Sequence, residues 1–273
     1  MKKFMNQLGY PLNLRNPQTY CEKIQWLKFN QQHTDDKVIS RADKYAVREF
    51  VKSKGYGNNL VELYGCWDSP EEIDWERLPN RFVLKLNNGS GPKYRWFIKD
   101  KGTFSREKFK DEVKESMSRN FGFKKGEFHY SKMPKKIIAE AYIGAEGDAI
   151  KDYKFYCFHG EVAFFQVEAG VIDGTMVRDY YNLDWTASHV NFIDNVPRPI
   201  QPFEKPVGFN EMVLMAQSLS QGYPHLKVDL YNVDGHIIFG ELTYSPRNGI
   251  TKWDPPSLDL EFGKLMNLKD ITH

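Results

Sequence analysis

Two carboxylates in neighbouring apolar segments near the C-terminus are the first candidates for chemistry. Asp229 stands in KVDLYNV and Glu241 in HIIFGELTY, and the intervening Asp234-Gly235 predicts the turn of a β-hairpin. Carboxylates held close together repel each other, and each is costly to remove from water. A divalent cation relieves both costs, and hard oxygen ligands suit magnesium that bridges to phosphate. The pair is therefore a candidate magnesium site.

The register of this hairpin decides whether the two carboxylates meet. A two-residue turn places Asp229 opposite Gly240 and sends Glu241 to the other face of the sheet. A three-residue loop places Asp229 opposite Phe239 and leaves Glu241 diagonal to it on the same face. The residues alone leave both registers open. They are equally compatible with two unrelated acids on a solvated sheet.

A glycine-rich segment, NNGSGPK, is a candidate phosphate loop. It directly follows the apolar segment RFVLKL, in which Lys85 adds a positive charge. Gly89 and Gly91 let the backbone fold tightly and present N–H groups to an anion, while Ser90 adds a hydroxyl and Lys93 a second charge. The segment has neither the spacing of a Walker loop nor the helix that follows a Rossmann glycine loop. A ligand-free hairpin turn is the alternative.

Periodicity and capping signals predict the elements that must position these residues. The first 18 residues are expected to be irregular. Lys44 falls near the first turn of the second predicted helix, where a solvated lysine is the simpler interpretation. Helices are predicted at 19–30, 40–55, 105–120, 210–221 and 258–268, and strands at 60–67, 81–86, 94–99, 136–143, 152–158, 161–168, 175–182, 227–233 and 236–244.

The composition is that of an ordinary globular protein without a general affinity for polyanions. Of the 273 residues 41% are hydrophobic and 27% are charged, and the net charge is +2, so nucleic acid is not an expected partner. The three cysteines show neither a disulfide nor a zinc spacing. The N-terminal segment lacks the apolar stretch of a signal peptide, and no apolar run reaches membrane-spanning length. We expect a cytoplasmic protein.

Several segments taken together resemble a known family. They are NPQTYCEKIQWLKF, ADKYAVREFV, FVLKLNNGSG, IIAEAYI, DYKFYCFHGEV and KVDLYNVDGHIIFGELTYSP. A cationic strand with a glycine loop, then an apolar strand, then a hairpin with two carboxylates is an order similar to that of the ATP-grasp fold. The set looks like the TupA-like ATP-grasp family, which is found with genes for teichuronopeptide and for capsular or O-antigen polysaccharides. The resemblance runs from about residue 16 to about residue 268.

The resemblance implies an α+β fold in which two lobes of mostly antiparallel sheet, with helices, close on ATP and magnesium. An N-terminal helical segment would cover residues 1–80, a small lobe residues 81–140 and a large lobe residues 141–273. It implies that magnesium is bound by Asp229, Glu241 and Thr243. It implies that ATP is bound by Lys44, Lys85, Gly89, Ser90, Gly91 and Lys93, by Glu140, Tyr142 and Ile143 at the adenine hinge, by Glu146 or Asp148 at the ribose, and by Lys154.

The chemistry that the resemblance implies is carboxylate activation. A carboxylate attacks the γ-phosphate to give an acyl phosphate and ADP, and an amine then displaces phosphate to form an amide. Lys227 would stabilise charge on the transferring phosphoryl group. Arg178 and Arg247 would grip the carboxylate of a uronic acid or amino acid, because arginine pairs with carboxylates bidentately. Structural roles for both arginines are equally compatible with the sequence. The partners implied are a carboxylate, an amine and a polysaccharide assembly complex.

The sequence departs from the family pattern at three places. Thr243 stands where many ATP-grasp enzymes have a metal-binding asparagine, Asn88 stands where we expect histidine, and Arg247-Asn248 replaces a small Gly-Ser pair. Three other functions therefore stay open. A sugar kinase would use the same nucleotide site, a glycosyltransferase would need a nucleotide-sugar, and a degenerate ATP-grasp module would bind nucleotide without turnover.

Overall fold

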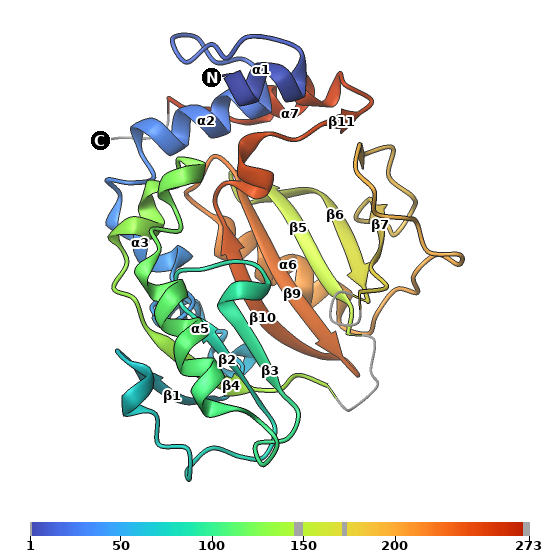
Figure 1. The fold of residues 1–273 in the computed structure, drawn as a ribbon. Coiled ribbons are helices and arrows are strands. Elements are labelled where there is room, and N and C mark those ends of the chain that lie inside the picture. Colours follow the sequence, from blue (N-terminus) through green and yellow to red (C-terminus); the bar gives the residue numbers. More distant parts are fainter. Residues whose placement is uncertain (1, 145–149, 171–173, 270–273) are drawn as a thin grey trace. The chain divides into compact units, whose positions relative to one another are not determined.

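The computed structural model describes residues 2–144, 150–170 and 174–269. The chain forms two compact units, one comprising Met1–Gln31 with Glu146–His273 and the other Gln32–Ala145 (Figure 1). These units divide the chain differently from the three segments that the resemblance implied. Residues 1–31, which we expected in one segment with residues 32–80, pack in the larger unit.

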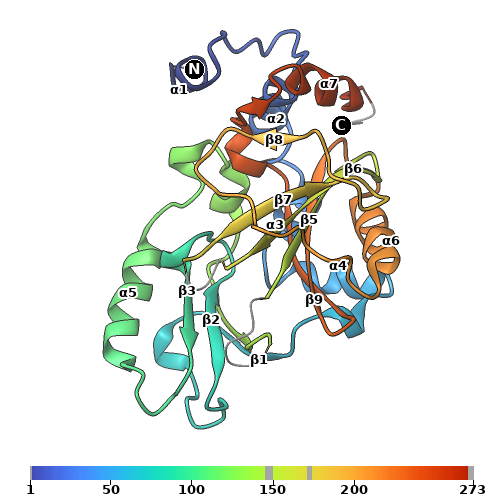
Figure 2. The ribbon, with the colours of Figure 1, turned by 90° about the vertical axis from the view of Figure 1, so that its right-hand side faces the viewer.

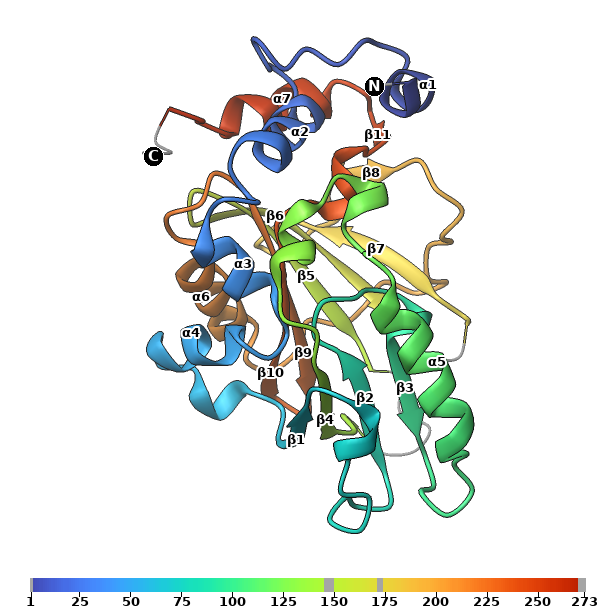
Figure 3. The same cartoon turned by 60° about the vertical axis from the view of Figure 1, so that its left-hand side comes forward.

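The smaller unit is built on a four-stranded antiparallel sheet in the order β1-β4-β2-β3. Side chains alternate along β2, so Phe82 and Leu84 lie on one face and Lys85 lies on the other. The first face joins Phe109 and Val113 of α5 in a buried core, and Figure 3 shows α5 alongside this sheet. The elements are α3 (Asp36–Ala42), α4 (Val47–Ser53), β1 (Leu63–Trp67), β2 (Phe82–Leu86), β3 (Arg95–Ile98), α5 (Arg106–Ser118) and β4 (Ile137–Ala141).

The helix predicted over residues 40–55 is wrong, because the chain breaks at Asp43. Helix α3 ends at Ala42, and Asp43 takes an extended conformation with φ −79° and ψ 121°. The Oδ1 atom of Asp43 accepts hydrogen bonds from the backbone N–H groups of Tyr45 (2.8 Å) and Ala46 (3.1 Å). An aspartate that bonds the backbone two or three residues ahead favours a turn over a continuing helix. Lys44 therefore lies in the turn between two short helices.

The larger unit is built on a five-stranded antiparallel sheet in the order β10-β9-β5-β6-β7. A two-stranded sheet of β8 and β11 accompanies it. The elements are α1 (Lys2–Leu8), α2 (Tyr20–Asn30), β5 (Asp152–Phe158), β6 (Glu161–Ala169), β7 (Val177–Tyr181), β8 (Asn191–Phe192), α6 (Phe209–Ser220), β9 (Leu226–Val233), β10 (His236–Thr243), β11 (Trp253–Asp254) and α7 (Leu258–Leu265).

One face of the five-stranded sheet is apolar and packs against α6. Phe155 of β5 and Phe165 of β6 stack on each other, and both rings contact Phe209 at the start of α6. Val228 pairs directly with Phe155, so it shares this face and is fully buried. Figure 2 shows α6 along one side of the sheet. The opposite face carries the charged residues described below.

Helix α2 begins as the sequence predicts. The hydroxyl of Thr19 accepts from the backbone N–H of Glu22, and the Glu22 carboxylate accepts from that of Thr19, which is a complete capping box. Ile24 and Leu27 are fully buried in a cluster that includes Leu258 of α7. This cluster joins the two ends of the chain within one core.

The other predicted elements are present with boundaries shifted by a few residues, and three elements were not predicted. Helix α1 lies in the stretch expected to be irregular, and the two-residue strands β8 and β11 carry too little pattern to read from sequence. Short 3₁₀ helices complete the description at Gly57–Asn59, Pro70–Glu72, Pro92–Tyr94, Phe123–Lys125, Phe128–Lys132 and Pro246–Gly249.

Candidate active site

A β-bulge brings the two carboxylates of the hairpin together. The turn has two residues, Asp234 at φ 51° and Gly235 at φ 86°, and Val233 pairs with His236. The ladder then shifts by one residue between Phe239 and Glu241, so Glu241 pairs directly with Asp229. Both registers expected from the sequence are therefore wrong. The short turn is present, but the extra residue reverses its consequence and places both acids on one face.

Gly240 is the residue that makes this bulge possible. A Cβ atom at that position would lie 2.9 Å from the carbonyl oxygen of Asp229 and 3.1 Å from the ring of Tyr231. Any side chain there would push the two strands apart at the point where the carboxylates meet. The residue pattern places Gly240 inside the strand predicted over 236–244 and does not show its effect on the register of the hairpin.

The carboxylate pair belongs to a row of directly paired residues that crosses all five strands. Glu241 pairs with Asp229, Asp229 with Lys154, Lys154 with Gln166 and Gln166 with Tyr180. Residues directly opposite each other share a face of the sheet, so the whole row lies on the face away from α6. Residues two positions along each strand share the same face: Lys227, Asp152, Glu168 and Arg178.

The ammonium group of Lys154 lies at the centre of this face. Its Nζ atom contacts Asp152, lies 3.1 Å from Asp229 Oδ2 and lies 3.5 Å from Glu168 Oε2. Lys227 Nζ lies 2.6 Å from the same oxygen of Asp229. Burial by itself would lower the pKa of Lys154, but the surrounding carboxylates raise it well above its usual value. Lys154 is therefore held as a cation among acids.

The acids respond differently to burial. Burial raises the pKa of Asp152 to about 6, against the opposing effect of the Lys154 ammonium. Burial also acts to raise the pKa of Glu168, but Lys154 and Arg178 outweigh it and the net shift is downward. Burial thus favours the protonated form of Asp152, whereas its cations keep Glu168 ionised.

The geometry fits a magnesium ion at Asp229 and Glu241. Asp229 is 2% exposed, and its Oδ1 atom has no hydrogen-bond partner in the described part of the chain, while both lysines use Oδ2. A buried carboxylate oxygen without a partner is costly unless a cation binds it. Thr243 donates to Glu241 Oε1 at 3.3 Å and so stands beside the second acid.

The described residues hold no group of three or more histidine, cysteine, aspartate or glutamate side chains arranged for a metal. Magnesium is commonly held by one or two carboxylates together with substrate phosphates, so the Asp229–Glu241 pair is sufficient in number.

Arg178 and Arg247 meet at one carboxylate that the sequence analysis did not identify. Asp194 Oδ2 accepts from Arg178 at 2.6 Å and from Arg247 at 2.9 Å. Arg178 also contacts Glu168 through Nε (2.7 Å) and a terminal nitrogen (2.6 Å), so all three of its nitrogens are engaged. Arg247 uses only one terminal nitrogen on described residues, and its side chain is 31% exposed. Arg247 is the better placed of the two to bind an anion.

The backbone that carries Arg247 is unusual. Arg247 and Asn248 both lie in the left-handed region, at φ 51° and φ 61°, which is unfavourable for residues with side chains. Helix α2 holds this segment in place. Gln25 Nε2 donates to the carbonyl oxygens of Asn248 (2.8 Å) and Gly249 (3.0 Å), and Lys28 Nζ donates to Asn248 Oδ1 (2.6 Å). Neither contact could be read from sequence, because more than 200 residues separate the partners.

In the smaller unit the structure joins Lys85 to Glu140. Lys85 Nζ lies 2.7 Å from Glu140 Oε2, and Arg48 lies 3.5 Å from Glu140 Oε1. Glu140 is 7% exposed, so its carboxylate is a buried partner for two cations. Tyr142 packs edge-on against Phe97 with ring centroids 5.8 Å apart. Arg48 is a residue that the sequence analysis missed.

Asn87 fixes the start of the glycine-rich loop. Its Nδ2 donates to Asp43 Oδ2 (2.6 Å) and to the Pro134 carbonyl (2.7 Å), and its Oδ1 accepts from the Lys136 N–H (2.8 Å). This side chain is fully buried. It links the turn before α4, the loop and the segment before β4.

The glycine loop itself has the expected conformational demands. A Cβ atom at Gly89 would lie 2.2 Å from the ring of Tyr94, and Gly91 lies at φ 93°. Lys44 Nζ donates to the Gly89 carbonyl at 2.7 Å. This lysine therefore contacts the loop, although it lies in a turn and not in the predicted helix. Ser90 and Lys93 are exposed. These residues could present hydrogen-bond donors to a phosphate.

The predicted site residues thus form two groups. Lys154, Lys227, Asp229, Glu241, Thr243 and Arg178 lie on or beside one face of the larger unit, and Arg247 reaches the same cluster through Asp194. Lys44, Lys85, the glycine loop, Glu140, Tyr142 and Ile143 lie in the smaller unit. Glu146 and Asp148 lie outside the described residues.

Comparisons with known proteins identify a family and a fold. A family model described as TupA-like ATPgrasp matches residues 22–267. A D-alanine–D-alanine ligase from Helicobacter pylori is similar in fold, with a TM-score of 0.50 and 12% identity over 90% of this chain and 68% of that protein. The corresponding ligase from Bacillus anthracis gives a TM-score of 0.46 and 13% identity, over 84% and 68%.

A third solved structure, the ADP complex of N5-carboxyaminoimidazole ribonucleotide synthetase, gives a TM-score of 0.44 and 14% identity. This match covers 82% of the present chain but spans only half of that protein. The search of curated proteins gives no match. Among the described residues, no helix combines the length and apolar character needed to cross a membrane.

Proposed function

This chain belongs to the TupA-like ATP-grasp family, and we propose that it is a Mg-ATP-dependent ligase that joins a carboxylate to an amine through an acyl phosphate. The observation that carries the proposal is the bulge that sets Glu241 opposite Asp229, whose buried Oδ1 atom has no partner among the described residues. Two carboxylates next to two lysines form a site suited to a cation and to phosphate oxygens.

Magnesium bound at this pair would polarise the phosphates and offset their charge. Asp229 and Glu241 would hold the ion, with the Thr243 hydroxyl beside Glu241. Lys227 and Lys154 would approach the transferring phosphoryl group, because both already project onto this face. In the smaller unit, the phosphates would be contacted by Lys44, Lys85, Gly89, Ser90, Gly91 and Lys93, and the adenine by Glu140, Tyr142 and Ile143. Glu146 or Asp148, outside the described residues, would hold the ribose.

The acceptor carboxylate would bind at Arg247. Its guanidinium has two nitrogens without partners in the described chain. The third nitrogen binds Asp194, which also pairs with Arg178. We therefore assign binding of the acceptor to Arg247 and a supporting role to Arg178. The proposed acceptors are uronic acids or amino acids of surface polysaccharide biosynthesis in the cytoplasm, in line with the family resemblance. This enzyme would work beside a polysaccharide assembly complex.

One observation favours a second candidate, a sugar kinase. Arg178 and Arg247 are matched in formal charge by Asp194 and Glu168. A cluster without net charge binds a neutral sugar hydroxyl without the desolvation cost of an added anion. The nucleotide site would be the same for both reactions.

The test is release of ADP from Mg-ATP against a panel of uronic acids, sugars, amino acids and amines. A ligase releases ADP only when a carboxylate and an amine are both present, and Glu241→Gln abolishes the release. A matched control is Glu161→Gln, which makes the same change at an exposed position at the start of β6 and should leave ADP release unchanged. ADP release with a sugar alone would replace the ligase by the kinase. Mg-ATP binding without turnover on any acceptor would indicate a degenerate module.

A further inference from the structure

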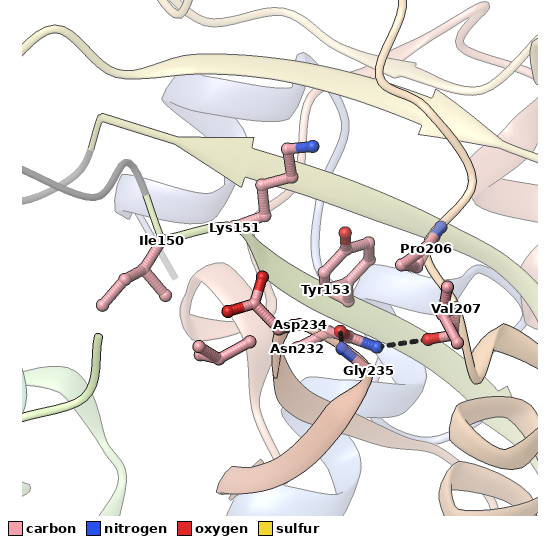
Figure 4. Close-up of a pocket in the computed structure, with 9 residues that line it drawn as sticks. Ile150, Lys151, Tyr153, Pro206, Val207, Asn232, Asp234 and Gly235 are labelled. Atoms are coloured by element: carbon pink, nitrogen blue, oxygen red, sulfur yellow. Dashed lines mark hydrogen bonds between the residues drawn. The ribbon is translucent and has the colours of Figure 1, made fainter. Parts of the chain in front are cut away.

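A pocket lies on the side of the larger unit's sheet opposite the carboxylate pair (Figure 4). It has a volume of about 370 Å³, within the range of small-molecule sites. Its walls are the start of β5, the tip of the β9–β10 hairpin and the segment before α6. Tyr153 pairs with Leu230 and Val167, which are residues of the face that packs against α6. The pocket is therefore separate from the face that carries Asp229.

Two hydrogen-bond donors of this pocket lack partners in the part of the chain that the structure describes. Tyr153 lines the pocket, no described residue accepts a hydrogen bond from its hydroxyl, and Figure 4 shows this hydroxyl directed toward the side on which Lys151 lies. Lys151 makes no ion pair with a described residue, and its ammonium lies 5.8 Å from the centre of the Phe203 ring. A hydroxyl and an ammonium that face a pocket without a protein partner are free to donate to a bound acceptor.

Burial raises the pKa of Tyr153 to about 12, so its hydroxyl keeps its proton at neutral pH and can donate it in a hydrogen bond to an acceptor. A neutral hydroxyl and an ammonium on one wall suit a carboxylate. Pro206, Val207 and Val233 supply apolar surface nearby. Asp234 is an exposed acid at the rim, which disfavours a second negative charge on a ligand and favours an ammonium group.

Asn232 holds these walls together and is not available to a ligand. Its Nδ2 donates to the Val207 carbonyl at 2.8 Å, and its Oδ1 accepts from the Gly235 N–H at 2.9 Å. The hairpin tip and the segment before α6 are thereby joined. Hydrogen bonds thus fix the walls of the pocket. Lys151 and Tyr153 are its two donors without partners among the described residues.

We infer that this pocket binds a small monocarboxylate with an apolar body, its carboxylate on Lys151 and Tyr153 and its body against Val207 and Val233. Free apolar amino acids belong to this class, with the α-ammonium toward Asp234. The inference does not depend on the ligase assignment, because no residue of the pocket belongs to the proposed active site.

Calorimetric titration of the full chain with four compounds of one shape tests the inference. L-leucine has both charged groups, 4-methylvalerate only the carboxylate, leucinamide only the ammonium, and 4-methylvaleramide neither. Saturable binding of the two carboxylates and none of the two amides is expected. Tighter binding of leucine than of 4-methylvalerate, lost in Asp234→Asn, identifies an amino acid as the occupant. Equal binding identifies a simple carboxylate.

The variants locate the site. Lys151→Met is expected to weaken binding by about tenfold or more and Tyr153→Phe by about fivefold, as for one charged and one neutral hydrogen bond. Tyr153→Phe removes only the hydroxyl, so the fold is retained. Lys205→Met removes a lysine of the neighbouring segment outside the pocket and should leave binding unchanged. Binding should also persist in Glu241→Gln and with saturating Mg-ATP.

Three results would overturn the inference. The first is the absence of saturable carboxylate binding, which means that the pocket holds water only. The second is binding that survives both Lys151→Met and Tyr153→Phe. The third is binding that is lost in Glu241→Gln, which would place the carboxylate at the other face of the sheet.

Discussion

At the scale of single residues, the charged face of the larger sheet is an arrangement of acids and lysines in which each position has a different environment. Asp152, Asp229 and Glu168 surround one ammonium group, that of Lys154. Burial shifts the pKa of Asp152 upward, whereas Glu168 is shifted downward by its cations. As the pH falls, Asp152 is therefore expected to take up a proton before Glu168 does.

The first prediction concerns the pH dependence that Asp152 imposes on stability. Its pKa rises from 3.8 to about 6 on folding, so the folded state favours the protonated acid. Stability from this group is present below pH 4 and is lost as the pH rises to about 6, by up to about 3 kcal/mol. Asp152→Asn removes this dependence and keeps an acceptor for Lys154. The difference in free energy of unfolding between the variant and the wild type should grow between pH 4 and 6 in urea titrations. A constant difference across this range would contradict the argument.

The candidate residues were predictable where their chemistry lies in the residue type. Asp229 and Glu241 stand out as charged residues inside apolar strands, whereas Lys154 and Lys227 became candidates only through the family resemblance. Asp194 was not identified, because it lies in a loop and its importance comes from two arginines that approach from distant parts of the chain. Charge partners at long range are set by tertiary packing, which one sequence does not display.

At the scale of elements, the β9–β10 hairpin and the 246–249 segment each depend on one local exception to regular backbone. The bulge at Gly240 sets the register, and the left-handed pair at Arg247 and Asn248 sets the direction of a guanidinium. The strands and helices around them follow the apolar pattern closely enough to be predicted. The exceptions were not predictable, because close backbone approach, not polarity, produces them.

The second prediction tests the bulge. Gly240→Ala introduces a Cβ atom 2.9 Å from the Asp229 carbonyl, so the strands must separate. We expect a loss of stability of about 1–3 kcal/mol and a larger loss of ATP turnover, because the carboxylates no longer meet. Gly57→Ala is the matched control, since its Cβ would have an ordinary contact of 3.5 Å. Denaturant unfolding and ADP release measure both effects. Full turnover in Gly240→Ala would show that the register does not matter.

The third prediction tests the support that α2 gives to the 246–249 segment. Gln25→Leu removes three hydrogen bonds, one from Lys28 and two that Gln25 donates to the carbonyl groups of Asn248 and Gly249. The expected cost is about 1–3 kcal/mol in the free energy of unfolding, together with a raised KM for the acceptor and an unchanged KM for ATP. Gln217→Leu, which removes one exposed hydrogen bond to Glu161, should cost less than about 0.5 kcal/mol. Equal costs in the two variants would argue against the support.

At the scale of the whole molecule, the chain forms two units with separate cores. The α+β class and the mostly antiparallel sheets were predicted, and the ATP-grasp resemblance is confirmed by the family match. The structure divides the chain into two units, where the resemblance implied a small lobe, a large lobe and an N-terminal segment. Leu27 near the N-terminus and Leu258 near the C-terminus share one cluster, a pairing that local patterns do not reveal.

The fourth prediction tests this division. Leu27→Ala and Leu84→Ala make the same substitution at fully buried positions, one in each unit. Each should cost about 3 kcal/mol. Hydrogen exchange should then accelerate in β5, β6 and β9 for Leu27→Ala but in β2 and β4 for Leu84→Ala. Faster exchange across both units in either variant would mean that they unfold as one.

The row of residues that crosses the five-stranded sheet also limits how chains of this fold can differ in length. Side chains alternate between the two faces, so inserting or deleting one residue within β5, β6 or β9 exchanges the core with the charged face. Two-residue changes keep both faces, and changes in the loops keep them at any length. Relatives of this protein should therefore vary in length between β7 and α6, where no strand of the sheet would be displaced, and hardly at all inside the strands. The sheet accommodates an extra residue only where its pairing register shifts, at Gly240 of the edge strand β10 and between Val162 and Phe164 of the inner strand β6.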